Sequence, residues 1–206
     1  MEPTIPESFK KSIDWFILSL ASMRTLGYQK PVSMLIHTSS KIKEHEVICN
    51  LVESYLEQIK GNQTSFFKDL ETLYSDESID FSRSRFLENM ENYSTPDNVP
   101  TYPSWIDIKA QIERIFRLDD KNYVSHVQMS ESGQPKYHDG FHIAIDNSRA
   151  NSADEFVRLV YPTKKNMTKL APAFIVIGGN TLSRGLTIEG LVSTFFLRTT
   201  SQADTL

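Results

Sequence analysis

Asn, Thr, Ser and Arg side chains gather in one short stretch of the sequence, directly after an apolar run of strand length. Gly178 and Gly179 end that run and precede Arg184 and Gly185. Glycine lets backbone N–H groups approach an anion closely, and the planar guanidinium of arginine suits phosphate. The stretch therefore predicts a phosphate-binding loop, whose hydroxyl and amide side chains are Asn180, Thr181, Ser183 and Thr187. The alternative is an ordinary strand connection with a solvated arginine.

Apolar runs predict the strands that position this loop. Continuous runs of this kind are typical of a parallel sheet that is covered on both faces. The expected strands are residues 32–37, 123–129, 141–146, 174–177 and 191–197. Helical spacing of apolar residues predicts helices at 6–26, 43–60, 64–90, 105–116 and 153–160.

Alternation of strands and helices predicts an α/β fold with a mostly parallel sheet. We expect residues 1–42 and 119–206 to form the α/β core. Residues 43–118 are expected to form a long crossover, made of one helix and a helical insertion.

Polar residues follow two further predicted strands. Thr38 and Ser39 come directly after the first strand, and Asn147 and Ser148 come after residues 141–146. Ligands of parallel α/β sheets gather at the carboxyl ends of the strands. We therefore expect three polar loops to converge on one edge of the sheet.

The motif around Arg184 resembles a known family. Gly178-Gly179-Asn180-Thr181-Leu182-Ser183-Arg184-Gly185-Leu186-Thr187, followed by Glu189-Gly190-Leu191, Arg198 and Asp204-Thr205-Leu206, is similar to the signature of the endonuclease Z-one domain family. Residues 33–39 and 146–148 look like its earlier motifs. The resemblance runs from about residue 10 to the end, and residues 43–120 match only loosely.

That family in turn resembles the second RecA-like domain of superfamily-two helicases. The resemblance implies a RecA-like fold in a bacterial restriction or defence protein that binds DNA. It implies nucleotide contacts by Gly178, Gly179, Arg184, Gly185 and Thr187, and nucleic-acid contacts by Thr38, Ser39, Asn147, Ser148, Asn180, Thr181 and Ser183. Thr187 stands where the helicase pattern has Asp, and its hydroxyl carries no charge.

A triphosphate-binding Gly-x-x-x-x-Gly-Lys-Ser/Thr loop does not occur in the sequence, so we do not expect the chain alone to hydrolyse ATP. The resemblance implies that ATP and Mg²⁺ belong to an upstream RecA-like domain of the same protein, which would be a partner of this chain. It also implies that the chain is a fragment that ends before the helicase arginine finger. We expect no cofactor in this fragment itself.

Composition narrows the function further. The formal net charge is −4, so DNA contact requires a local basic group such as Lys164, Lys165 and Lys169. We expect the single Cys49 to exclude a disulfide within the chain and a cysteine-based zinc site, which fits a cytoplasmic protein. The early apolar segment 15–21 is too short to span a membrane, so no membrane partner is expected.

Two alternatives from other functional classes stay open. Asp97, Asp107 and Lys109 match the acidic pattern of metal-dependent nucleases, although residues 105–116 follow helical rather than strand spacing. The insertion at 64–103 could instead dock a protein partner. His138, Asp139 and His142 could share a metal, but the intervening Gly140 favours a surface loop.

Overall fold

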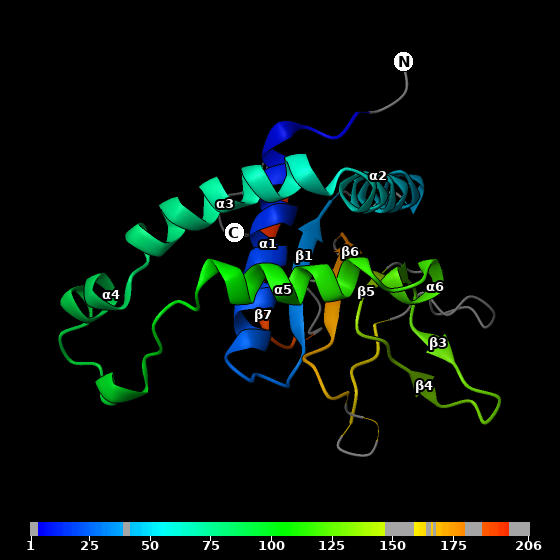
Figure 1. Ribbon diagram of the computed structural model, residues 1–206. Coiled ribbons are helices and arrows are strands. Elements are labelled where there is room, and N and C mark those ends of the chain that lie inside the picture. The colour runs from blue at the N-terminus through cyan, green and yellow to red at the C-terminus, as the bar shows by residue number, and fades with distance from the viewer. Residues whose placement is uncertain are drawn as a thin grey trace, which may run out of the picture.

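The computed structural model describes residues 4–38, 42–146, 159–163, 166, 168–179 and 187–197. Figure 1 shows a sheet with several helices in front of it and a helical segment that leads away from it. The elements are α1 (Glu7–Thr25), β1 (Val32–His37), α2 (Ile42–Gly61), α3 (Gln63–Asp80), α4 (Arg83–Asn89), η1 (Pro96–Asn98), α5 (Trp105–Phe116), α6 (Asp120–Tyr123), β2 (Val124–Ser125), β3 (Gln128–Met129), β4 (Pro135–Lys136), β5 (Phe141–Asp146), β6 (Ala173–Gly178) and β7 (Leu191–Phe196).

Five strands form one parallel sheet in the order β2-β5-β6-β1-β7. Every residue of the central strand β6 is buried, which explains its unbroken apolar sequence. The long crossover from β1 to β2 carries the helices α2 to α6, as is usual for connections between parallel strands. The predicted α/β fold with a mostly parallel sheet is thus confirmed, and it is consistent with a RecA-like architecture.

One face of the sheet is covered by helices. Helix α1 packs against β1 and β7, α2 packs against β5 and β6, and α3 and α5 pack against α1. In Figure 1, α5 crosses in front of α1. The insertion therefore contributes to the main core, through the buried side chains Phe66, Phe67, Leu70, Leu73, Ile108, Ile112, Ile115 and Phe116.

A buried arginine joins this helical layer to the sheet. Arg24, in the last turn of α1, is 4% exposed, and its Nε and Nη2 donate to the carbonyl oxygen of Ala171 at 2.9 and 2.6 Å. Burial lowers the pKa of this guanidinium to about 10, so it keeps its charge at neutral pH. The arginine thus fixes the end of α1 to the segment that leads into β6.

The opposite face carries a smaller apolar cluster. Val127, Leu159 and Ile188 cover Phe174 and Val176 of β6 on this side. The short hairpin of β3 and β4 projects away from the sheet (Figure 1) and contributes Tyr137, whose ring meets that of Phe174 edge-on at 6.2 Å. Loop segments rather than described helices therefore cover this face.

Two predicted elements differ from the structure, and a third is largely untested. Residues 123–129 do not form one strand, because Asp119 caps the short helix α6 by accepting from the Asn122 N–H, and only two-residue strands follow. The helix expected at 64–90 breaks at Phe81, after which Ser82 caps α4. The helix expected at 153–160 lies largely outside the described residues.

Strand β7 also corrects an expectation. Its apolar sequence predicts burial on both faces, yet Leu191 is 45% and Phe196 is 51% exposed. Among the described strands β7 pairs with β1 alone, so it forms an edge of the sheet. Edge position is a property of the assembled sheet and leaves no mark in the strand's own sequence.

Candidate functional site

The carboxyl edge of the sheet is the place where the predicted polar loops begin. His37 and Asp146 both lie opposite Gly178 in the strand registers, and His37 also lies opposite Phe196. Four neighbouring strands, β5, β6, β1 and β7, therefore end side by side. The Thr38 N–H donates to the Gly178 carbonyl at 2.8 Å and extends the pairing by one residue.

The structure brings three predicted site residues together at this edge. Gly178 ends β6 and Gly179 follows it, and Thr38 follows β1 beside Gly178. All three are buried, and Thr38 is only 2% exposed. Its hydroxyl thus lies inside the structure, so Thr38 is placed to support the loop rather than to form an open contact.

Thr187 is not among the residues that the structure brings together at the carboxyl edge. It is exposed, and the segment after it returns to the start of β1, where Ser33 Oγ donates to the Glu189 carbonyl at 2.7 Å and the Ser33 N–H donates to the Gly190 carbonyl at 2.8 Å. A third hydrogen bond holds this segment, because the Tyr161 hydroxyl accepts from the Glu189 N–H at 3.1 Å. Thr187 therefore lies close in sequence to residues at the amino edge of β1, whereas Gly178 marks the carboxyl edge.

Most of the predicted contact residues lie outside the described residues. They are Ser39, Asn147, Ser148, Asn180, Thr181, Ser183, Arg184 and Gly185, together with Lys164 and Lys165 of the proposed basic group. Lys169 is described and exposed. The strands that hold both ends of the phosphate-binding loop are thus described, while its polar centre is not.

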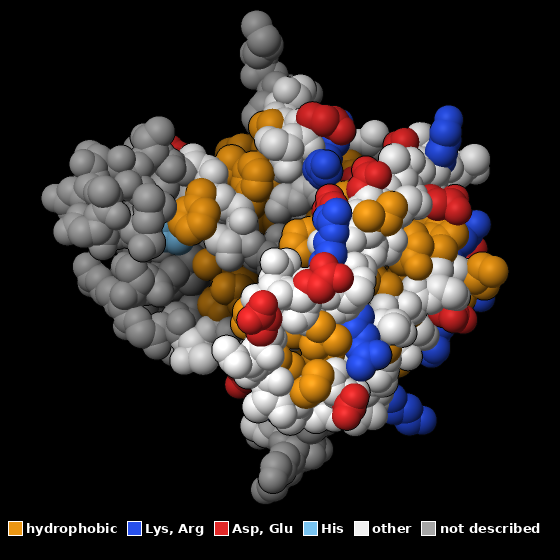
Figure 2. Space-filling model, turned by 90° about the vertical axis from the view of Figure 1, so that its left-hand side faces the viewer, with side chains coloured by type: hydrophobic (Ala, Val, Ile, Leu, Met, Phe, Trp, Pro, Cys, Tyr) orange, Lys and Arg blue, Asp and Glu red, His pale blue; other side chains and the backbone are white. Residues whose placement is uncertain are grey.

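Charge on the described surface is mixed. Figure 2 shows basic and acidic side chains interspersed on the left-hand side of Figure 1, with hydrophobic side chains between them. Several basic groups are paired with acids, including Arg85 with Asp80 at 2.7 Å and Arg117 with Glu113 at 3.2 Å. The described part of this face therefore lacks a broad basic patch.

The nuclease-like pattern has structural explanations. Asp107 lies in the first turn of α5, where Ser104 Oγ donates to its carboxylate at 2.6 Å and accepts from its N–H at 3.3 Å. Lys109 Nζ lies 5.0 Å from the centre of the Phe67 ring. A helix cap and a cation–π contact account for these two side chains, and Asp97 lies in the exposed η1 turn.

His138 and His142 form a stacked pair, with ring centres 4.0 Å apart, rather than the expected surface loop. Both ring nitrogens of His142 are engaged, because Nδ1 lies 3.0 Å from the Ala173 carbonyl and Nε2 accepts from the His138 N–H. Burial lowers the pKa of His142 to about 3 and that of His138 to about 4. The pair is therefore neutral at physiological pH and has no free ring nitrogen on His142 for a metal.

A different set of side chains could hold a metal ion. Cys49, Glu53 and His126 place one possible ligand atom each within 4.8 Å of one another. Burial raises the pKa of the Cys49 thiol to about 12, and the Glu53 carboxylate adds to the rise, so the thiol carries its proton here. A single cysteine can belong to such a group, because Glu and His can supply the other ligands.

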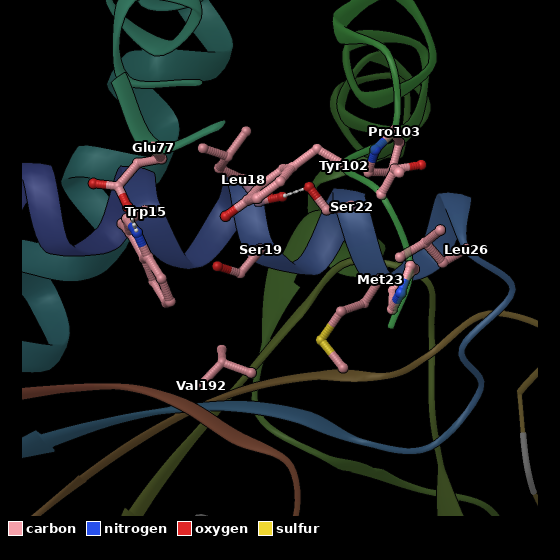
Figure 3. A pocket seen from close by; sticks show the side chains of 12 residues that line it. Trp15, Leu18, Ser19, Ser22, Met23, Leu26, Glu77, Tyr102, Pro103 and Val192 are labelled. Carbon is pink, nitrogen blue, oxygen red and sulfur yellow. Dashed lines mark hydrogen bonds between the residues drawn. The ribbon is translucent and has the colours of Figure 1, made fainter. Parts of the chain in front are cut away.

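An apolar cavity of about 270 Å³ lies between α1, the segment before α5 and β7. Figure 3 shows Leu18 of α1 and Leu26, just after its end, near Tyr102 and Pro103. The Met23 side chain points towards the sheet, where Val192 lies. The Trp15 indole N–H donates to Glu77 at 3.0 Å at one end. Val192 is the second residue of β7, so this cavity lies at the amino end of that strand and is separate from the carboxyl edge.

Comparison with known proteins gives one match. The family model of the Z1 domain matches residues 8–206. Comparisons with curated proteins and with solved structures return no match. None of the helices in the described ranges is long and apolar enough to cross a membrane.

Proposed function

Because the chain belongs to the Z1 domain family, we propose that it works as the second RecA-like domain of a bacterial restriction or defence enzyme of the endonuclease and helicase-like type. In this role the carboxyl edge of the sheet binds nucleic-acid backbone and one side of a nucleotide. An upstream RecA-like domain of the same protein supplies the site for ATP and Mg²⁺.

The observation that carries the proposal is the common edge at which β5, β6, β1 and β7 end. The polar stretches that follow β1, β5 and β6 in the sequence begin at this edge, and ligands of parallel α/β sheets gather at such an edge. A buried, parallel strand is a rigid base for such loops, because its six positions are fixed on both sides by neighbouring strands. The fold thus supplies a scaffold on which small loops bind ligand.

Arg184 is the principal phosphate contact in this proposal. The nucleic-acid strand receives hydrogen bonds from Asn180, Thr181 and Ser183. The backbone of that strand can approach the protein closely at Gly178, Gly179 and Gly185, which have no side chain. Ser39, Asn147 and Ser148 add contacts from the neighbouring loops. Thr187 contacts the nucleotide in this proposal. Close after it in the sequence, the Glu189 carbonyl accepts from Ser33 Oγ at the amino edge of β1.

DNA-stimulated ATP hydrolysis by the complete protein tests this role. We expect Arg184→Ala to lower the DNA-stimulated rate while folding stays unchanged, because a phosphate contact is lost. Arg117→Ala is the matched control, since Arg117 is an exposed arginine paired with Glu113. An Arg184→Ala protein that is stimulated as strongly as the control would remove the proposed role.

A partner-docking role for the insertion is the second candidate, and exposed apolar side chains favour it. Ile79, Phe81 and Met90 are 64, 63 and 51% exposed near the end of α3 and around α4. Deletion of residues 64–103 would also remove buried core, so Ile79→Ser with Phe81→Ser is the cleaner test. Loss of a protein partner with unchanged DNA binding would support docking by this surface.

A further inference from the structure

Cys49 and Glu53 lie one turn apart on α2, and His126 follows β2 at the opposite border of the sheet. Residues four positions apart on a helix share one face, so thiol and carboxylate point the same way. The atoms that could bind a metal lie within 4.8 Å of one another, across three side chains from two elements. Ligand atoms around a tetrahedral Zn²⁺ are separated by roughly 3.5 Å, so a side-chain adjustment of about 1 Å would close the site.

The orientation of His126 gives an independent indication. Its Nδ1 lies 2.8 Å from the carbonyl oxygen of Ile143. A carbonyl oxygen only accepts, so Nδ1 carries the proton and Nε2 keeps its lone pair. Metal-binding histidines are typically oriented in this way, by donating their other N–H to a carbonyl or a carboxylate. The hydrogen bond to β5 thus fixes both the ring and its tautomer.

The donor set also indicates the kind of metal. A thiolate and an imidazole are soft or borderline ligands that favour Zn²⁺ and similar transition metals over Mg²⁺ or Ca²⁺. The cysteine is shielded from water, because Cys49 is 5% exposed, whereas Glu53 and His126 are partly exposed. Shielding from water strengthens the attraction between a cation and a thiolate at this position.

We propose that Cys49, Glu53 and His126 bind one Zn²⁺ ion through Sγ, a carboxylate oxygen and Nε2, with a fourth position open to water or a substrate group. Binding replaces the thiol proton by the metal, and this proton leaves to solvent. The ion would join α2 to the β2 border of the sheet. A three-ligand site with an open position is the arrangement that activates water in zinc enzymes.

Metal titration of the chelator-treated chain tests the proposal. We expect one Zn²⁺ per chain by calorimetry, and we expect Co²⁺, used as a coloured substitute, to produce a thiolate-to-metal charge-transfer absorption band. Cys49→Ser should abolish that band. His126→Gln should weaken Zn²⁺ binding by more than the roughly 10–100-fold that loss of an outer partner costs a metal site.

Glu57→Gln is the matched control for Glu53→Gln, because Glu57 lies one turn further along α2 and is exposed. We expect Glu57→Gln to bind Zn²⁺ as the parent does and Glu53→Gln to bind it more weakly. Circular dichroism checks that each variant is folded, and His126→Gln replaces Cys49→Ser if the buried substitution unfolds. Equal binding by the parent and the three ligand variants, or a Co²⁺ spectrum without a thiolate band, would overturn the proposal.

Discussion

Gly190 shows how one residue of the family motif is determined by packing. Its φ is +62°, and a Cβ atom at this position would lie 1.8 Å from the carbonyl oxygen of Pro31. The Gly190 carbonyl also accepts from the Ser33 N–H, at the start of the β1–β7 pairing. This glycine is therefore required by the close approach of two backbones and needs no ligand to explain it.

Gly190→Ala should accordingly destabilise the chain by more than about 3 kcal/mol, since left-handed strain and a backbone clash add together. Gly133→Ala is the control, because Gly133 has φ +73° but nothing within 4 Å of its added Cβ. We expect it to cost roughly 1 kcal/mol. Urea unfolding measures both, and equal losses would contradict the role of Pro31.

Elements differ in how far the sequence predicts them. The apolar runs of β1, β5 and β6 predict their strands well, and Ser104 marks the start of α5 because its hydroxyl caps the helix. The two-residue strands β2, β3 and β4 are too short to carry a periodic signal. The possible metal ligands Cys49, Glu53 and His126 could not be predicted as a group, because His126 lies far along the chain from α2. The sequence indicates only that Cys49 and Glu53 share one face of a helix.

The first part of the insertion is buried and its far end is exposed, and two of its phenylalanines show the difference. Phe66 is 5% exposed and packs against Phe67 and Phe116, whereas Phe86 on α4 is 36% exposed. Phe66→Ala should cost about 3–5 kcal/mol through the cavity it leaves. Phe86→Ala should cost about 1 kcal/mol or less. Chemical denaturation compares the two, and similar losses would show that α4 is also part of the core.

At the scale of the whole molecule, buried histidines make stability depend on pH. His142 and His138 have folded pKa values of about 3 and about 4, below the usual value near 6.5. The unfolded chain therefore binds protons that the folded chain does not, and stability falls as pH drops below about 6.5. Asp14 opposes this loss of stability below about pH 6. Burial raises the pKa of its carboxyl group to about 6, so the folded chain takes up this proton more readily than the unfolded chain.

We expect the free energy of unfolding to fall between pH 6.5 and pH 4, with each histidine contributing up to about 1.4 kcal/mol per pH unit. His142→Gln should reduce this slope, since glutamine does not titrate. Asp14→Asn should steepen it, because the opposing carboxyl is removed. Urea unfolding at a series of pH values checks both directions, and a parent protein with pH-independent stability would contradict the buried neutral pair.

The proposal that the carboxyl edge of the sheet binds nucleic acid is tested most directly by measuring DNA binding to this chain at several salt concentrations. Fluorescence anisotropy with a labelled single-stranded DNA gives the binding constant for the parent, Arg184→Ala and the control Arg117→Ala. We expect Arg184→Ala to bind more weakly and to lower the slope of log K against log salt by about 1, as loss of one phosphate contact requires. Identical affinity and slope for Arg184→Ala and Arg117→Ala would contradict the proposal that Arg184 binds phosphate at this edge.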